Sequence, residues 1–142
     1  MNKDKKNNTR AEDMKSLAED VKAAFIEVSP FIEKHTAIVC PDCENVCCKD
    51  KHARHDSDDL LFLNALSAEL PSDVPGLEES DPCRNMTDMG CSLERWMRPG
   101  RCTTFFCDEL LESLQGGDPK LYRAFMIYLK YLADARSELI SH

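Results

Sequence analysis

A chain of 142 residues has the length of one domain with a single modest hydrophobic core. Its acidic residues outnumber its basic residues by 26 to 18, which gives a formal net charge of −8. This charge argues against binding to a nucleic acid or an anionic membrane surface, and it favours a protein partner with a basic or neutral surface.

The N-terminal segment is polar. Residues 1–8 are rich in Asn and Lys, which is typical of a disordered tail, and we expect residues 9–142 to form one domain. This segment lacks the apolar centre of a secretory signal, and no later segment has the roughly 18 apolar residues of a membrane span. The sequence therefore predicts a cytoplasmic protein.

The first predicted helix begins at Thr9, which has capping-box spacing with Glu12. Apolar residues then recur at steps of three and four along one face. These are Met14, Leu17, Val21, Phe25, Val28 and Ile32. Because proline lacks a backbone N–H group, we expect Pro30 to kink or divide this helix.

A second helix is predicted over residues 58–70, with Asp58 and Asp59 as an acidic cap and Pro71 preventing continuation. Residues 71–82 then have the Pro, Ser, Asp and Gly content of a loop. We expect this helix to be a spacer that packs on the terminal helices through four leucines. They are Leu60, Leu61, Leu63 and Leu66.

Two helices are predicted near the C-terminus. A short one over 108–114 ends at Gly116 and Gly117, and Asp118 with Pro119 begins the last one. The last helix has a broad apolar stripe suited to packing on the first helix. The stripe contains Leu121, Phe125, Ile127, Tyr128, Leu129, Leu132 and Leu139. No useful alternating strand pattern occurs, so the sequence predicts a mainly α, small single domain of about four helices.

The eight cysteines fall into two short segments, 40–48 and 83–107, which we expect to be irregular loops. Cys40 and Cys43 have the CxxC spacing that lets two thiolates bind one tetrahedral ion at about 2.3 Å. The adjacent Cys47 and Cys48 point in different directions in most backbone conformations. In a reducing compartment an even number of cysteines indicates metal binding, with disulfides or a redox switch as the alternative.

The second segment contains Cys83, Cys91, Cys102 and Cys107. Arg98 and Pro99 precede Cys102; the proline stiffens the approach to a ligand, and the arginine is placed to donate to sulfurs or backbone carbonyls. If both segments bind the same metal region, they should lie together in the fold, because closing the intervening loop costs only a few kcal/mol.

The combined cysteine pattern resembles the putative zinc- or iron-chelating domain family named for its CxxCxxCC motif, the YkgJ-like proteins. The matching residues are Cys40, Cys43, Cys47 and Cys48, then Cys83, then CSLERWM from Cys91, then Arg98, Pro99 and Cys102, and finally Cys107 after an aromatic residue. The first cluster reads CxxCxxxCC, one residue longer than the family name, and the gap between Cys91 and Cys102 also looks one residue longer. The resemblance covers residues 40–107 and implies binding of zinc or an iron–sulfur cluster.

All eight cysteines are therefore candidate metal ligands, and no catalytic residue is predicted. No nucleotide-binding or hydrolase motif occurs, and no cysteine stands apart from the clusters with a histidine base, so the sequence favours a binding protein over an enzyme. The alternatives are a redox-active iron–sulfur protein, for electron transfer or as an accessory to a modifying enzyme, and a protein for metal storage or delivery.

Other residues near the cysteines have more ordinary interpretations. His52 and His55 lie in a charged loop, where solvated side chains are favoured over metal ligands. His35 and His142 are interpreted as surface residues. The aromatic residues beside the second segment, Trp96, Phe105 and Phe106, are expected to pack and shield the site from water, with a docking surface for a partner as the minority interpretation.

Overall fold

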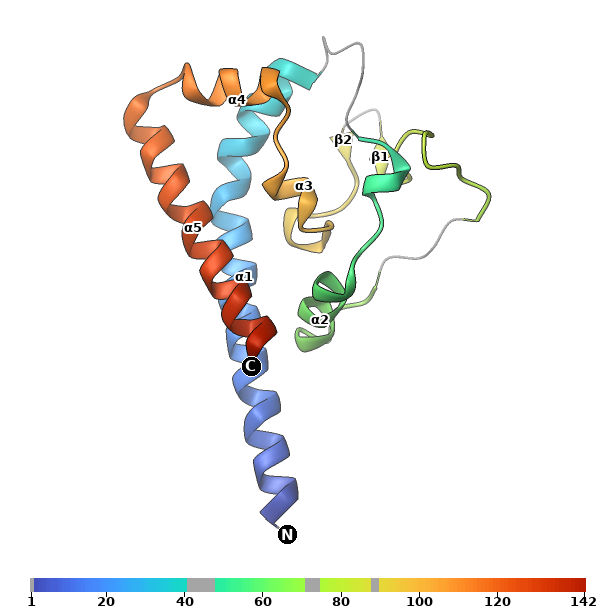
Figure 1. Ribbon diagram of the computed structural model, residues 1–142, viewed down its shortest axis with the longest axis vertical. Coiled ribbons are helices and arrows are strands. Elements are labelled where there is room, and N and C mark those ends of the chain that lie inside the picture. The colour runs from blue at the N-terminus through green and yellow to red at the C-terminus, as the bar shows by residue number, and fades with distance from the viewer. Residues whose placement is uncertain (1, 41–47, 71–74, 88–89) are drawn as a thin grey trace.

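A computed structural model describes residues 2–40, 48–70, 75–87 and 90–142, and it is mainly helical (Figure 1). The prediction of a mainly α fold is confirmed. The elements in chain order are α1 (Asn2–Val39), the 3₁₀ helix η2 (Asp50–His52), α2 (Ser57–Ala65), β1 (Met86–Thr87), β2 (Gly90–Cys91), the 3₁₀ helix η3 (Arg95–Met97), α3 (Arg101–Thr104), α4 (Asp108–Gln115) and α5 (Pro119–Ser141).

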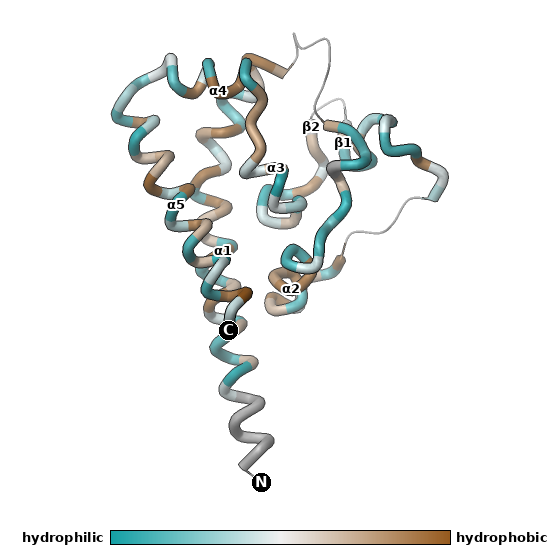
Figure 2. Tube along the Cα trace, viewed as in Figure 1, coloured by the Kyte–Doolittle hydropathy of each residue, from teal (hydrophilic) through white to brown (hydrophobic). Residues whose placement is uncertain are grey.

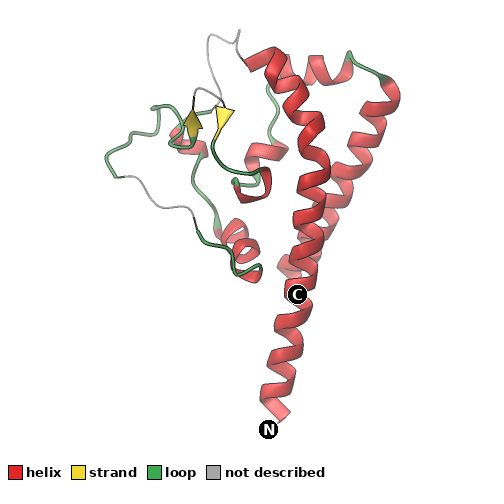
Figure 3. Ribbon diagram, turned by 180° about the vertical axis from the view of Figure 1, so that it is seen from behind, coloured by secondary structure: helices red, strands yellow, loops and turns green. Residues whose placement is uncertain are grey.

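The two long helices form the frame of the molecule. α1 and α5 run side by side in opposite directions, and the chain between them folds along one side of the pair (Figures 1 and 3). Hydrophobic and hydrophilic residues alternate along both helices (Figure 2). Buried apolar residues of both helices, such as Val21 and Leu132, belong to one core cluster. Phe125 of α5 contacts aromatic rings of two other segments. Its ring centroid lies 4.5 Å from that of Phe31 and 6.1 Å from that of Phe106. The predicted packing of the last helix on the first is confirmed.

The prediction that Pro30 kinks or divides the first helix is wrong, because α1 continues through it to Val39. Pro30 is exposed, so water can bind the carbonyl group that loses its hydrogen bond. The buried residues Val28 and Ile32 keep the helix packed on both sides of the proline. At its other end, the helical backbone includes residues 2–8, which the sequence assigns to a disordered tail. Propagating a packed helix gains one hydrogen bond per added residue.

The predicted bounds and cap of the second helix need correction. Its N-cap is Asp56, not the Asp58–Asp59 pair, and Asp56 forms a capping box with Asp59. The helix ends at Ala65 instead of Leu70, because Ser67 adopts a left-handed conformation with φ of 55°. The N–H groups of Ser67 and Ala68 bond back to carbonyls of the last turn, so the chain turns away before Pro71 is reached.

α2 packs on both α1 and α5, as expected of a spacer, although the predicted apolar face is only partly correct. Leu63 is fully buried, and Leu61 and Leu66 pack against the core, whereas Leu60 is 37% exposed. Phe62, which was not assigned to this face, is buried and stacks near Phe25 at 5.7 Å.

The C-terminal helices begin where the sequence predicts. α4 extends one residue past the predicted range, to Gln115, with Gly116 as its C-cap, and the Asp118 side chain caps α5 by accepting a hydrogen bond from the Lys120 N–H at 2.8 Å. His35 differs from the prediction of a surface position, because it is buried between α1 and α4 and its Nδ1 lies 2.9 Å from the Ser113 hydroxyl. Burial and the nearby Lys34 charge lower the pKa of His35 below its ordinary value.

Candidate metal centre

The backbone brings the two cysteine segments together at Cys48 and Cys83. Lys49 and Pro82 form an antiparallel bridge, and the Cys83 N–H donates to the Cys48 carbonyl at 3.0 Å. Residues directly opposite one another in such a pairing point to the same face, with Cβ atoms about 5 Å apart. The bridge therefore makes neighbours of two thiols from different segments.

A buried ion pair reinforces this bridge. The Arg84 guanidinium donates to both carboxylate oxygens of Asp50 at 2.8 Å, and the Arg84 N–H donates to the same carboxylate at 3.3 Å. The Asp50 side chain is fully buried and that of Arg84 is 10% exposed. The hydrogen bonds from Arg84 lower the pKa of the Asp50 carboxyl group. Because Arg84 follows Cys83 and Asp50 lies two positions after Cys48, the pair holds the two segments in register.

A small hairpin returns the chain from Cys83 to Cys91. The Cys83 carbonyl accepts from the Met86 N–H at 2.9 Å, and β1 pairs with β2 so that Met86 faces Cys91. The Asn85 N–H lies 3.5 Å from the Cys83 sulfur. Backbone donors to sulfur stabilise the thiolate form that binds metals.

Cys102 is held by arginines anchored on α1. Arg95 donates to the Cys102 carbonyl at 3.1 Å and also pairs with Glu33 of α1. Arg98 donates to the Leu93 carbonyl at 2.9 Å and lies 3.2 Å from the Glu33 carboxylate. The predicted donation by Arg98 to a backbone carbonyl of the loop is confirmed. These contacts connect the chain around Cys102 to the helical frame.

The Cys102 thiol lies within electrostatic reach of three other cysteines. Burial raises its pKa, the negative charges of Cys48, Cys83 and Cys91 raise it further, and the Arg98 charge opposes them; the pKa reaches about 11. The Cys48, Cys83 and Cys91 thiols thus act electrostatically on Cys102. The Cys102 thiol resists ionisation until a cation compensates its charge.

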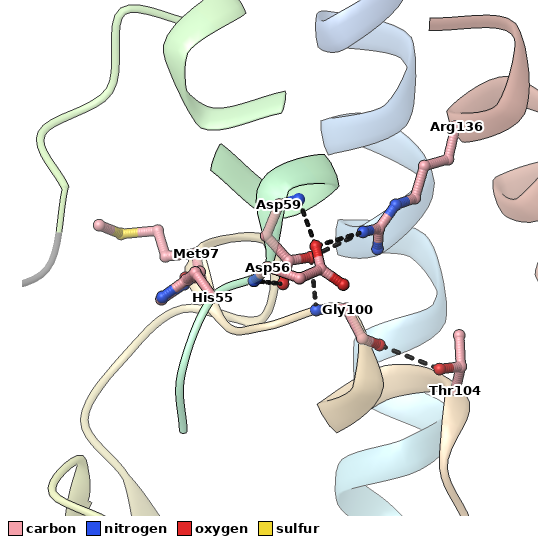
Figure 4. Close-up of polar contacts among 7 residues, drawn as sticks. All are labelled: His55, Asp56, Asp59, Met97, Gly100, Thr104 and Arg136. Atoms are coloured by element: carbon pink, nitrogen blue, oxygen red, sulfur yellow. Dashed lines mark hydrogen bonds and ion pairs between the residues drawn. The ribbon is translucent and has the colours of Figure 1, made fainter. Parts of the chain in front are cut away.

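A second group of polar contacts fixes the loop before Cys102 (Figure 4). The buried Asp59 carboxylate accepts from the Gly100 N–H at 2.9 Å and from Arg136 of α5 at 2.7 Å. The same carboxylate accepts from the Asp56 N–H at 3.0 Å, and the Asp59 N–H donates to the Asp56 carboxylate at 2.8 Å, which are the two halves of the capping box. We call these four residues, Asp56, Asp59, Gly100 and Arg136, the Asp59 clamp. It joins α2, α5 and the loop that leads to Cys102.

The other predicted ligands lie in different surroundings. Cys40 directly follows α1 and is exposed, while Cys107 is the N-cap residue of α4 and packs against the hydrophobic core. Cys43 and Cys47 lie outside the described residues. Across residues 2–40, 48–70, 75–87 and 90–142, no three or more cysteine, histidine or acidic side chains are arranged so that they could hold a metal ion.

The neighbouring histidines and aromatic residues have structural partners where they are described. His55 Nε2 lies 2.8 Å from the Met97 carbonyl, and the side chain of His52 is outside the described part. Trp96 and Phe106 are partly buried against the core, which confirms their packing role. Phe105 is 61% exposed, so the prediction that it packs over the site is wrong.

Sequence reasoning missed the charged residues that position the thiols. Asp50 with Arg84, Glu33 with Arg95, and Asp59 with Arg136 are far apart in the chain, and single charged residues carry no sign of a distant partner. One signal was available: Asp56 and Asp59 have the spacing of a capping box.

Comparison with known proteins adds no relative. No protein-family model, curated protein or solved structure matches this chain. The resemblance to the YkgJ-like domain therefore depends on the sequence pattern of residues 40–107 alone. None of the helices in the described part of the chain is long and apolar enough to cross a membrane.

Proposed function

We propose that this protein binds zinc or an iron–sulfur cluster through cysteine thiolates, with Cys48, Cys83, Cys91 and Cys102 at the centre of the site. The observation that carries this proposal is the bridge between Lys49 and Pro82 with the adjoining Cys83-to-Cys48 hydrogen bond, because it brings the backbones of both cysteine segments together in the fold. Cys40, Cys43, Cys47 and Cys107 remain candidates for completing the site or forming a second one.

The surroundings of the four thiols suit a thiolate centre. A centre with four thiolates is negatively charged, and guanidinium groups nearby offset such charge. Arg98 acts on Cys102 in this way, and the Asn85 N–H points to the Cys83 sulfur. Arg98 and Asn85 both lie in the second cysteine segment, and donors close to the ligands commonly orient metal-binding sulfurs.

One observation favours the alternative of metal delivery or redox activity. Cys48 is exposed, whereas Cys83, Cys91 and Cys102 are partly buried. A ligand at the surface gives an acceptor protein or a small-molecule thiol access to the metal, whereas purely structural sites are closed. A basic or neutral protein partner remains a prediction from the net charge.

The test is metal analysis of full-length protein purified without oxygen. We expect tightly held zinc or iron; an absorption band near roughly 400 nm would identify an iron–sulfur cluster, and its absence with bound zinc would identify a zinc site. Less than about 0.2 metal per chain in folded protein with reduced thiols would refute the proposal.

Single substitutions then locate the site. Cys83→Ser and Cys102→Ser should each lower the metal content, because each removes a thiol of the central group. Cys107→Ser tests whether Cys107, which packs on the core as the N-cap residue of α4, also belongs to the site. Equal metal content in all three variants and the parent protein would show that the second segment is not a ligand set, and its cysteines would then be buried or redox-active thiols.

A further inference from the structure

Arg136 of α5 reaches across to the loop that precedes Cys102. Its guanidinium lies 2.7 Å from Asp59 and 3.7 Å from Asp56, and its side chain is only 19% exposed. Gly100 leaves the space for it, because a Cβ atom at that position would overlap the guanidinium of Arg136. The glycine therefore lets the Arg136 side chain lie close against the loop backbone in the position that the structure shows.

The position of Gly100 determines that of Cys102. The Gly100 carbonyl accepts hydrogen bonds from the Thr103 N–H at 3.0 Å, the Thr104 N–H at 3.2 Å and the Thr104 hydroxyl at 3.2 Å (Figure 4). The Cys102 N–H donates to the Pro99 carbonyl at 2.9 Å, and Pro99 is fully buried. α3 is thus built directly on the clamped residues, so a shift of the loop is passed to the thiol.

Two sets of contacts, from different helices, act on this segment. The contacts from α1 reach Cys102 itself through Arg95 and its partner Glu33. The Asp59 clamp connects α2 and α5 to Gly100. If the clamp is lost, the contacts from α1 still keep the segment near the core, while the loop gains freedom before Cys102. This separation makes a local effect distinguishable from unfolding.

We infer that Arg136 is a positioning residue for Cys102 of the proposed thiol centre: through Asp59 it fixes Gly100 and thereby sets the position of Cys102. This inference rests on the proposed function and extends it to the C-terminal helix, which contributes no cysteine. Arg136 contacts Asp56 and Asp59, and it acts on Cys102 through the backbone of the loop.

The test compares three full-length variants, Arg136→Gln, Arg136→Lys and Arg123→Gln, each purified without oxygen. Arg123 is an exposed arginine on the same helix and is the matched control. Each protein is treated with a small alkylating agent, and mass spectrometry gives the labelling rate of every cysteine. The quantity compared is the labelling rate of Cys102 divided by that of Cys83, measured beside metal content and helical content.

We expect Arg136→Gln to raise this ratio about tenfold or more, because local opening exposes a partly buried thiol without global unfolding. Arg136→Lys keeps the positive charge near Asp59, so its labelling ratio should be closer to that of the parent protein than to that of Arg136→Gln. Arg123→Gln should match the parent protein. An unchanged ratio in Arg136→Gln overturns the inference. A uniform rise at all cysteines with loss of helical content also overturns it, since Arg136 would then serve only overall stability.

Metal content separates this inference from the proposed function. If the parent protein retains metal and the ratio of Cys102 to Cys83 labelling in Arg136→Gln equals that of the parent protein, the metal site stands and the positioning role of Arg136 fails. If the parent protein holds no metal while Arg136→Gln still exposes Cys102 selectively, the positioning role stands and the metal-binding function fails.

Discussion

Two adjacent aspartates in the first turn of α2 provide a direct test of the Asp59 clamp. Replacing Asp59 with alanine removes half of the capping box, which is worth about 1 kcal/mol. It also leaves the buried Gly100 N–H without its acceptor, at about 1–3 kcal/mol, and takes the nearest carboxylate from Arg136. Together these losses predict a decrease of about 3–5 kcal/mol in the free energy of unfolding, the range for breaking a buried pair.

Asp58→Ala is the matched variant. The described part of the structure shows no side-chain hydrogen bond or ion pair for Asp58, so it contributes only its charge at the helix N-terminus. Losing that charge should cost about 0.3–1 kcal/mol. Urea unfolding of both variants, followed by circular dichroism at equal metal loading, measures the difference. If Asp59→Ala and Asp58→Ala destabilise the protein equally, the clamp contributes no more than an ordinary surface charge.

Two further predictions follow from buried polar contacts. The folded state holds the pKa of His35 below its ordinary value, so as the pH falls through the ordinary imidazole range the folded protein binds fewer protons than the unfolded chain. The free energy of unfolding should therefore decrease from about pH 7.5 to about pH 5. The decrease should be less steep in His35→Gln. A pH dependence identical in both proteins would contradict this. Gly100→Ala should lower the free energy of unfolding by about 1–3 kcal/mol in the parent protein and by much less in a protein that also carries Arg136→Gln. A double-mutant cycle measures this difference. Additive effects would show that the guanidinium does not fill the space beside Gly100.

The helical frame was predictable because its signals are local. Repeated apolar residues define the buried face of α1, and Asp118 with Pro119 marks the start of α5. The errors arose where longer-range packing overrode local preference. α1 passes through Pro30 because flanking residues pack on α5, and α2 ends early because Ser67 takes a conformation more usual for glycine.

The candidate site was predictable only as a set of residue types. Cysteine spacing indicated metal ligands and led to the expectation that both segments lie together, and the bridge between Cys48 and Cys83 agrees with that expectation. The sequence did not distinguish Cys102, whose carbonyl accepts from Arg95, from Cys107, which packs on the core. That difference depends on where α3 and α4 are placed, and hence on contacts with distant parts of the chain.

The charged pairs around the thiols explain how loops with little apolar material keep a defined shape. In the described parts of residues 48–56 and 75–100, few side chains enter the hydrophobic core. Burial of apolar surface alone therefore stabilises these segments weakly. Two ion pairs supply directional contacts where apolar burial is small: Asp50 with Arg84, and Glu33 with Arg95. Desolvation offsets much of the attraction within the buried Asp50–Arg84 pair, so we expect this pair to fix one arrangement more than to add net stability. Polar contacts can therefore fix the order and spacing of the thiols, and in the proposed function the metal supplies the remaining free energy of folding.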